Sequence, residues 1–138
     1  MYKILKIEGR KSRKIRTLIF LLQENGEMST PEIKNYFIGK KISMTINELS
    51  NVLKKYGCFQ HVGYTKKDSM ISGAYEVKTW SLDYDGIIKK YETKDYTLND
   101  GWWRKVVFDT SSLEFTPISD HTKSGLWGDI RQQLEENK

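Results

Sequence analysis

The sequence is poor in cysteine and histidine, and it lacks a long hydrophobic run. Its one cysteine, Cys58, excludes an internal disulfide, and one thiol with two histidines offers too few soft ligands for a zinc site. The longest apolar run, Leu18–Leu22, has five residues, whereas a membrane-spanning helix needs about 20. The N-terminal charges Lys3, Lys6 and Glu8 are not followed by the apolar segment of a signal peptide. We therefore expect a protein of the reducing cytoplasm with no membrane segment.

Residues that could carry catalysis are also scarce. Asp120 and His121 are neighbours in sequence, but adjacency does not orient a base toward a substrate. No glycine-rich phosphate loop is present, because Asp85-Gly86 and Asp100-Gly101 are typical of turns. Asp83 and Asp85 are two residues apart in the sequence and could share a metal ion. A turn that follows the hairpin is the better interpretation of these two aspartates. We expect no enzyme activity, no metal and no small-molecule cofactor.

The composition favours a globular fold with one strongly basic half. Apolar residues make up 38% of the chain and aromatic residues 12%, which exceeds what disordered segments carry. Residues 1–80 contain 15 Lys/Arg against 7 Asp/Glu, whereas residues 81–138 contain 8 against 11. A basic half indicates a polyanionic partner, although lysine-rich surfaces also serve solubility alone.

Three short helices are predicted in the first half of the chain. We expect them over residues 13–24, 31–38 and 45–56. The first has apolar residues at helical spacing, at Ile15, Leu18, Ile19 and Leu22. The second and third each begin with a capping box, Ser29 with Glu32 and Thr45 with Glu48. A glycine follows each helix and favours its termination.

The third predicted helix has two distinct faces. The face expected to dock on the core carries Ile46, Leu49, Leu53 and Tyr56. The opposite face carries Asn47, Ser50, Asn51 and Lys54. Amide and hydroxyl side chains can hydrogen-bond base edges, and lysines can contact phosphates. An ordinary amphipathic helix with a solvated polar face is the alternative.

A β-hairpin over residues 58–82 follows the third helix. Its strands are rich in aromatic and β-favouring residues, and the segment Lys66–Gly73 between them reads as a long loop with a basic tip. Val77 and Trp80 fall on opposite faces of an ideal strand, which indicates a bulge or strong twist. We expect His61 to be structural and Cys58 to be a small core residue.

This order of elements resembles the winged helix-turn-helix superfamily over residues 10–82. The segment Ser29–Ile33 resembles the entry to that superfamily's second helix, and Thr45–Tyr56 resembles its recognition helix. The hairpin resembles the wing and ends, as many such wings do, in an aromatic, a polar residue and leucine: Trp80-Ser81-Leu82. The resemblance implies an α+β winged-helix domain at residues 1–82 that binds double-stranded DNA, with the third helix in the major groove.

Twelve residues are candidates for DNA contact. Basic residues before and in the first helix, the polar face of the third helix, and the tip of the hairpin supply them. They are Arg10, Lys11, Arg13, Lys14, Thr45, Asn47, Ser50, Asn51, Lys54, Lys55, Lys66 and Lys67. Cations at the start of the first helix interact unfavourably with its dipole, and an external phosphate would offset this repulsion. A solvated N-terminal tail and a solvated hairpin loop are the alternatives.

Residues 83–138 form a second predicted domain, an aromatic, β-rich extension that ends in a helix. Its candidate strands are Ile87–Tyr96, Trp102–Phe108 and Leu113–Ile118, the last an edge strand because of Pro117, whereas a further candidate strand, Tyr2–Glu8, belongs to the first domain. Leu126, Ile130 and Leu134 are spaced by four and predict the closing helix, either as core or as a homodimer seam. The function we expect is transcriptional regulation by a protein that joins the nucleoid when bound to DNA. A winged-helix adaptor that docks on protein is the alternative, and a ligand sensor would need a closed pocket in the extension.

Overall fold

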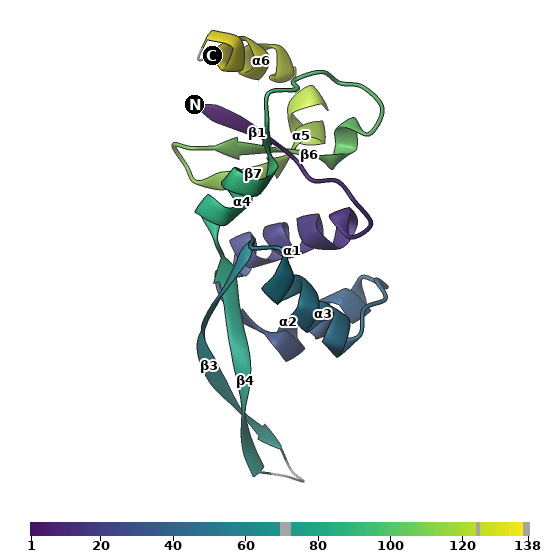
Figure 1. The fold of residues 1–138 in the computed structure, drawn as a ribbon, viewed down its shortest axis with the longest axis vertical. Coiled ribbons are helices and arrows are strands. Elements are labelled where there is room, and N and C mark those ends of the chain that lie inside the picture. Colours follow the sequence, from purple (N-terminus) through teal and green to yellow (C-terminus); the bar gives the residue numbers. More distant parts are fainter. Residues whose placement is uncertain (70–72, 124, 137–138) are drawn as a thin grey trace. The chain divides into compact units, whose positions relative to one another are not determined.

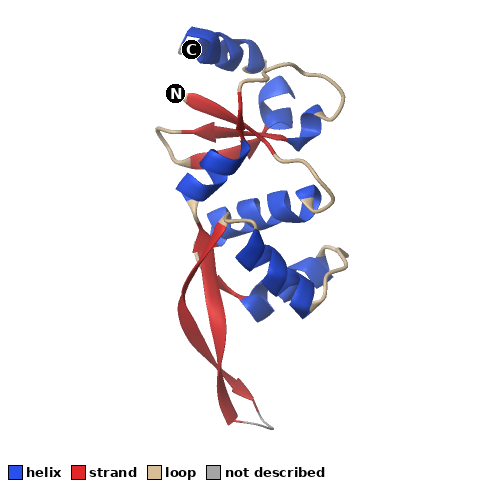
Figure 2. Cartoon of the chain, in the orientation of Figure 1, coloured by secondary structure: helices blue, strands red, loops and turns tan. Residues whose placement is uncertain are grey.

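The computed structural model describes residues 1–69, 73–123 and 125–136, and within residues 65–69, 73–75 and 123 it describes the backbone alone. By its internal contacts the chain divides into two units, residues 21–86 and residues 1–20 with 87–138. Six α-helices and two antiparallel sheets lie in the described parts (Figures 1 and 2). The expected α+β class is confirmed at this level.

The unit of residues 21–86 contains helices and a three-stranded sheet. Its elements are the end of α1 (Ser12–Asn25), β2 (Met28–Ser29), α2 (Thr30–Gly39), α3 (Ile46–Lys55), β3 (Phe59–Ser69) and β4 (Gly73–Leu82). The strand order is β2-β4-β3, and all pairs are antiparallel. The three predicted helices and the hairpin are confirmed, each boundary within two residues, whereas β2 was not predicted.

Caps fix where α2 and α3 begin. Ser29 and Glu32 form the predicted capping box, in which each side chain meets the other residue's backbone N–H. The Trp80 indole Nε1 donates to Thr30 Oγ1 at 3.1 Å, which ties the start of α2 to β4. At α3, Thr45 Oγ1 accepts from the Glu48 N–H at 3.1 Å. The local sequence thus sets the starts of both helices.

The hairpin strands run further than predicted (Figure 1). Lys66 pairs with Glu76 and Lys67 with Tyr75 inside the β3–β4 ladder, so the prediction of a loop over Lys66–Gly73 is wrong. Backbone hydrogen bonds can continue a ladder through polar residues, because pairing does not require an apolar face. The tip of the hairpin, residues 70–72, lies outside the described residues.

A β-bulge interrupts β3 between His61 and Gly63. The bulge confirms the irregularity that the positions of Val77 and Trp80 predicted for the hairpin. It lies in β3, however, and not in β4, the strand that contains those two residues. Gly63 has φ +153°, a backbone conformation that L side chains rarely adopt, and a Cβ built there meets no atom within 4 Å. Backbone conformation therefore accounts for glycine at this position.

The unit of residues 1–20 and 87–138 is built on a four-stranded antiparallel sheet of order β5-β1-β6-β7. Its strands are β1 (Tyr2–Lys6), β5 (Glu92–Thr93), β6 (Lys105–Asp109) and β7 (Glu114–Pro117). Its other elements are the end of α4 (Tyr84–Tyr91), the 3₁₀ turn η1 (Trp102–Arg104), α5 (Ile118–Lys123) and α6 (Trp127–Glu136). Pro117 lies in edge strand β7, as predicted.

Three expectations for the second half of the chain need correction. The first half of the strand expected at Ile87–Tyr96 belongs to helix α4, with only the short strand β5 after it, and the strand expected at Trp102–Phe108 begins with η1. The domain boundary expected after Leu82 placed the N-terminal strand with the winged helix. In the structure β1 pairs with β6 and β5, so the unit that contains it is discontinuous in sequence.

Most side chains predicted to face the core of the helices and hairpin are buried. Nine of them, which include Ile33, Phe37 and Trp80 besides the predicted positions of the first and third helices, are at most 4% exposed: Ile15, Leu18, Ile19, Leu22, Ile33, Phe37, Leu49, Leu53 and Trp80. Cys58 is buried too, as expected. A separate cluster joins Ile4, Val107, Ile118, Ile130 and Leu134. The last two belong to the predicted stripe of the closing helix, whereas Leu126 precedes α6 and is 49% exposed.

Candidate nucleic-acid interface

Helix α3 presents a polar face opposite the face that it buries. Leu49, Val52 and Leu53 are buried. Asn47, Asn51 and Lys54, spaced by four and three, share the opposite side at about 100° per residue and are exposed. Ser50 lies at the flank of this surface and is half-buried. We call Asn47, Asn51 and Lys54 the α3 polar face; it has the side-chain types that read base edges and contact phosphates.

Ile46 does not dock on the core as predicted. Its side chain is 46% exposed, and Val52 occupies the buried position instead. Ile46 is the first residue of α3 and lies one turn before Ser50, at the edge of the α3 polar face. An exposed aliphatic side chain there can contact a thymine methyl group. The sequence spacing concealed the exposure of Ile46, because Ile46 shares the i, i+3, i+7 pattern of the core residues.

Contacts within its own unit hold the start of α3 in place. Thr45 is exposed, but its hydroxyl already caps Glu48. The Lys34 ammonium donates to the Met44 carbonyl and so anchors the residue before the cap. Glu48 also places a carboxylate in the first turn, which complements the helix dipole without a bound phosphate. Thr45 is thus a weaker phosphate candidate than the sequence suggested.

The end of α3 carries two exposed lysines. Lys54 and Lys55 lie in its last turn, where cations are favoured by the dipole. The Lys55 ammonium lies 5.8 Å from the centre of the Tyr56 ring. Both lysines belong to the same unit as Asn47 and Asn51, so the predicted α3 residues are brought together.

The hairpin contributes an aromatic row that the sequence did not reveal. The His61 ring lies 4.9 Å from the Tyr64 ring, edge to face, and 5.5 Å from the Trp80 ring. The bulge places residues 61 and 64 on one face, although they are three apart. Tyr64 is 60% exposed and Trp80 only 4%. His61, predicted to be structural, is exposed in this row; the side chains of Lys66 and Lys67 lie outside the described atoms.

The predicted N-terminal basic residues belong to the other unit. Arg10 and Arg13 are exposed and Lys11 and Lys14 are half-buried, around the start of α1. Nearby, burial and the guanidinium groups of Arg104 and Arg13 lower the pKa of Arg16. The buried Arg16 Nη1 has no hydrogen-bond partner among the described residues. A bound anion would relieve this repulsion between like charges.

The excess positive charge is concentrated at the N-terminus. Residues 1–20 contain seven Lys/Arg and one acidic residue, whereas residues 21–86 contain eight of each. The unit that carries α3 is therefore neutral as a whole. Its polar face can supply hydrogen bonds, and most of the net attraction for a polyanion must come from residues 1–20.

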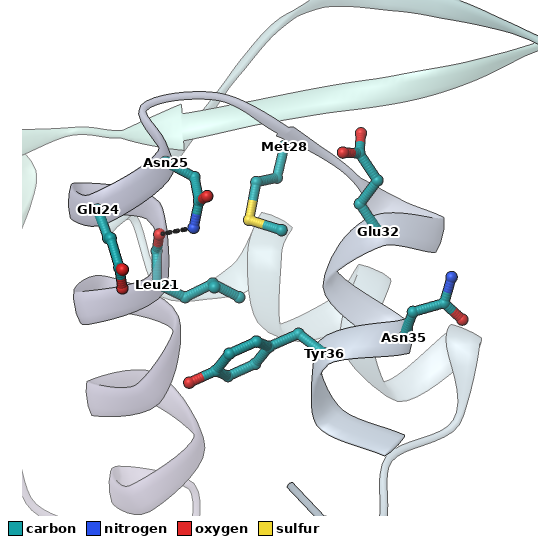
Figure 3. Close-up of a pocket in the computed structure, with 7 residues that line it drawn as sticks. All are labelled: Leu21, Glu24, Asn25, Met28, Glu32, Asn35 and Tyr36. Carbon is teal, nitrogen blue, oxygen red and sulfur yellow. Dashed lines mark hydrogen bonds between the residues drawn. The ribbon is translucent and has the colours of Figure 1, made fainter. Parts of the chain in front are cut away.

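An acidic groove marks a surface of the α3 unit that does not suit phosphate (Figure 3). It has a volume of about 570 Å³ and is lined by Leu21, Glu24, Asn25, Met28, Glu32, Asn35 and Tyr36. Figure 3 shows Tyr36 of α2 extending toward Leu21 of α1, with carboxylates on both helices. Asn25 Nδ2 donates to the Leu21 carbonyl at 2.9 Å. These carboxylates would repel a nucleic-acid backbone.

No three His, Cys, Asp or Glu side chains among the described residues are grouped so that they could hold a metal ion. The described helices include none with the length and apolar character of a membrane span.

The comparisons with known proteins give one structural similarity. No protein-family model matches this chain, and a search of curated proteins found no match. A crystal structure from an uncultured marine organism, described as that of a "putative nucleic acid binding protein", is similar with 26% identity and a TM-score of 0.42. The similarity covers 59% of this chain and 92% of that one.

Proposed function

We propose that residues 12–82 form a winged helix that binds double-stranded DNA, and that the protein regulates transcription. In this proposal α3 enters the major groove, where Asn47 and Asn51 read base edges and Lys54 contacts phosphate. The hairpin β3–β4 is the wing and lies along the backbone.

The observation that carries the proposal is the α3 polar face. It lies directly opposite Leu49, Val52 and Leu53, so the helix is anchored on one side and open to a groove on the other. A recognition helix needs this division, because its inner side must dock while its outer side fits between phosphates. The cap fixes where the helix begins, and the two lysines of the last turn extend the contact along the helix.

Two further features support the same function. The order helix, short strand, two helices, hairpin, with a sheet of order β2-β4-β3, fits the winged-helix arrangement. The seven cations of residues 1–20 supply the long-range attraction that the neutral α3 unit lacks. Arg10, Arg13 and Arg16 are the residues that we expect to contact phosphate there.

The first test is titration of the full chain with labelled duplexes, both random and selected from a random library, at two salt concentrations. Asn51→Ala should lose about 1–3 kcal/mol of binding free energy on a selected duplex and little on random DNA, because an amide there reads a base. Lys54→Ala with Lys55→Ala should weaken both duplexes and flatten the log-affinity against log-salt slope by about two units.

A matched control exists in α4. Lys89 and Lys90 also form an exposed lysine pair in a last helical turn before a tyrosine, and Lys90 lies 5.7 Å from the Tyr91 ring. Lys89→Ala with Lys90→Ala makes the same charge change and should leave the salt slope within error. Equal effects of the two double variants on the salt slope would mean that DNA affinity depends on the overall charge and not on where the lysines lie. Absence of salt-dependent DNA affinity in the wild type would refute the proposal.

A second candidate function is a protein adaptor. The observation in its favour is Trp103, whose side chain is 54% exposed with the Arg104 guanidinium 6.0 Å from its ring centre. Exposed Trp with Arg is a common centre of protein interfaces. If the DNA titration fails, this function takes precedence, and Trp103→Ala is then the variant that should abolish partner binding.

A further inference from the structure

We propose that a hollow beside the β3 bulge binds an unpaired nucleobase that carries an exocyclic amino group: cytosine, adenine or guanine. The inference rests on the proposed DNA binding. It specifies the bound DNA as a duplex that adjoins an unpaired stretch. The hollow, about 120 Å³ in volume, is lined by Glu27, Val62, Gly63, Tyr64 and Thr79. All five belong to the unit that carries α3.

The walls of the hollow suit the face of a base. Tyr64 is 60% exposed and its ring is supported from one side by His61, edge to face at 4.9 Å. Val62, 42% exposed, adds an apolar surface. At Gly63 a Cβ would meet nothing within 4 Å, so this stretch of backbone is open to a flat ligand. Aromatic side chains on a strand are a usual platform for stacked bases.

The polar lining selects the edge of the base. Glu27 is exposed and lines the hollow, and a carboxylate accepts a hydrogen bond from the amino group of cytosine, adenine or guanine. Thymine presents a carbonyl at the corresponding position and would meet the carboxylate with repulsion. The same negative charge keeps phosphates out, so the neutral base must enter while the backbone passes outside.

Only an unpaired base fits this description. In a duplex both faces of each base are covered by stacking and the Watson–Crick edge is used in pairing. A single-stranded overhang frees both the face and the edge. The α3 polar face and this hollow would then contact the paired and unpaired parts of one DNA.

The experiment compares one labelled duplex with four ends: blunt, and with short overhangs of cytidine, thymidine or abasic nucleotides. The full chain should bind the cytidine overhang more tightly than the thymidine overhang, and the abasic overhang no better than the blunt end. Tyr64→Ala should remove the gain, a loss of about five- to a hundredfold, whereas Tyr64→Phe should keep it. Thermal unfolding of both variants excludes a folding defect.

Glu27→Ala should abolish the preference for cytidine over thymidine. Glu24→Ala removes the same charge from the same unit, outside the hollow, and should leave that preference intact. Equal binding to cytidine and abasic overhangs, or a gain that survives Tyr64→Ala, would overturn the inference while blunt-duplex affinity still supports the proposed function. Binding to the overhang without any blunt-duplex affinity would support the hollow and refute the major-groove proposal. Binding to none of these DNAs refutes both.

Discussion

Lys105 is a fully buried lysine in β6 that is held by a loop of its own unit. Its ammonium donates to the Asp95 carbonyl at 2.9 Å and to the Thr97 carbonyl at 2.5 Å, and the Asp95 carboxylate lies 3.6 Å away. Hydrogen bonds from the Thr97 hydroxyl and N–H, together with Lys105 and Lys6, lower the pKa of Asp95 to about 2. The carboxylate therefore stays charged next to the lysine at any physiological pH.

Replacing this lysine should destabilise the β1–β6 unit. Lys105→Met keeps the length of the side chain but leaves two carbonyls without their donor, so the free energy of unfolding should fall by about 1–3 kcal/mol. Lys94→Met, an exposed lysine next to Asp95, should change it by less than about 0.5 kcal/mol. Urea titrations of the three proteins measure the difference. Equal midpoints for wild type and Lys105→Met would show that the loop contacts contribute nothing net.

Some features of single residues could be predicted from the sequence, and others could not. The exposure of Asn47, Asn51 and Lys54 follows from helical periodicity alone, because their spacing opposes that of Leu49 and Leu53. The contact between the His61 and Tyr64 rings depends on a bulge, and the burial of Lys105 depends on a loop ten residues earlier in the chain. The local sequence pattern could therefore indicate neither.

Helix α4 is the element that sequence analysis missed although a signal was present. Tyr84, Ile87, Ile88 and Tyr91 follow helical spacing, with Ile87 buried, and Asp83 Oδ1 accepts from the Gly86 N–H at 3.1 Å like a helix cap. β-Branched and aromatic residues together with the Asp-Gly pair favoured a strand and a turn instead. Periodicity was the better guide here than composition. In α1, α2 and α3, periodicity and caps agreed, and the predicted boundaries held.

The two glycines inside helices α4 and α6 should respond oppositely to alanine. A Cβ at Gly86 would collide with the Gly57 carbonyl oxygen and press on the Asp83 carboxylate, whereas one at Gly128 meets nothing within 4 Å. Gly86→Ala should therefore lower the unfolding free energy by about 1–3 kcal/mol. Gly128→Ala should raise it by up to about 1 kcal/mol, because alanine favours the helix. Thermal unfolding of the pair gives the sign, and stabilisation by Gly86→Ala would show that the backbone relaxes freely there.

At the scale of the whole molecule, the stripe on α6 decides between core and dimer seam. Ile130 and Leu134 are 2% and 7% exposed and pack with Ile4, Val107 and Ile118 of the same chain. The two side chains are thus already covered within one copy. Sequence spacing identified Ile130 and Leu134 correctly, but not Leu126, and it contained no information about their partner, because that partner is a sheet made from distant segments.

Substitutions on α6 test this assignment and the predicted homodimer together. Ile130→Ala with Leu134→Ala should lower the unfolding free energy by on the order of 5 kcal/mol through lost burial and cavities. Arg131→Ala with Glu135→Ala removes an exposed ion pair of 3.4 Å on the same helix and should cost less than about 1 kcal/mol. Sedimentation and urea titration distinguish the cases. A dimer seam would instead give a folded monomer from the first variant.

The pairing of β1 with β6 also fixes an order of events during synthesis. Residues 21–86 are contiguous and can fold as soon as they leave the ribosome. Residues 2–6 are made first, yet they wait for residues 105–109 before their backbone groups find partners. A nascent chain whose residues up to Gly86 have emerged thus carries the complete unit of residues 21–86 behind an unpaired strand segment, which is prone to edge-to-edge association. Translational pausing between these points would prolong that exposure, and a chaperone that covers the first residues would shorten it.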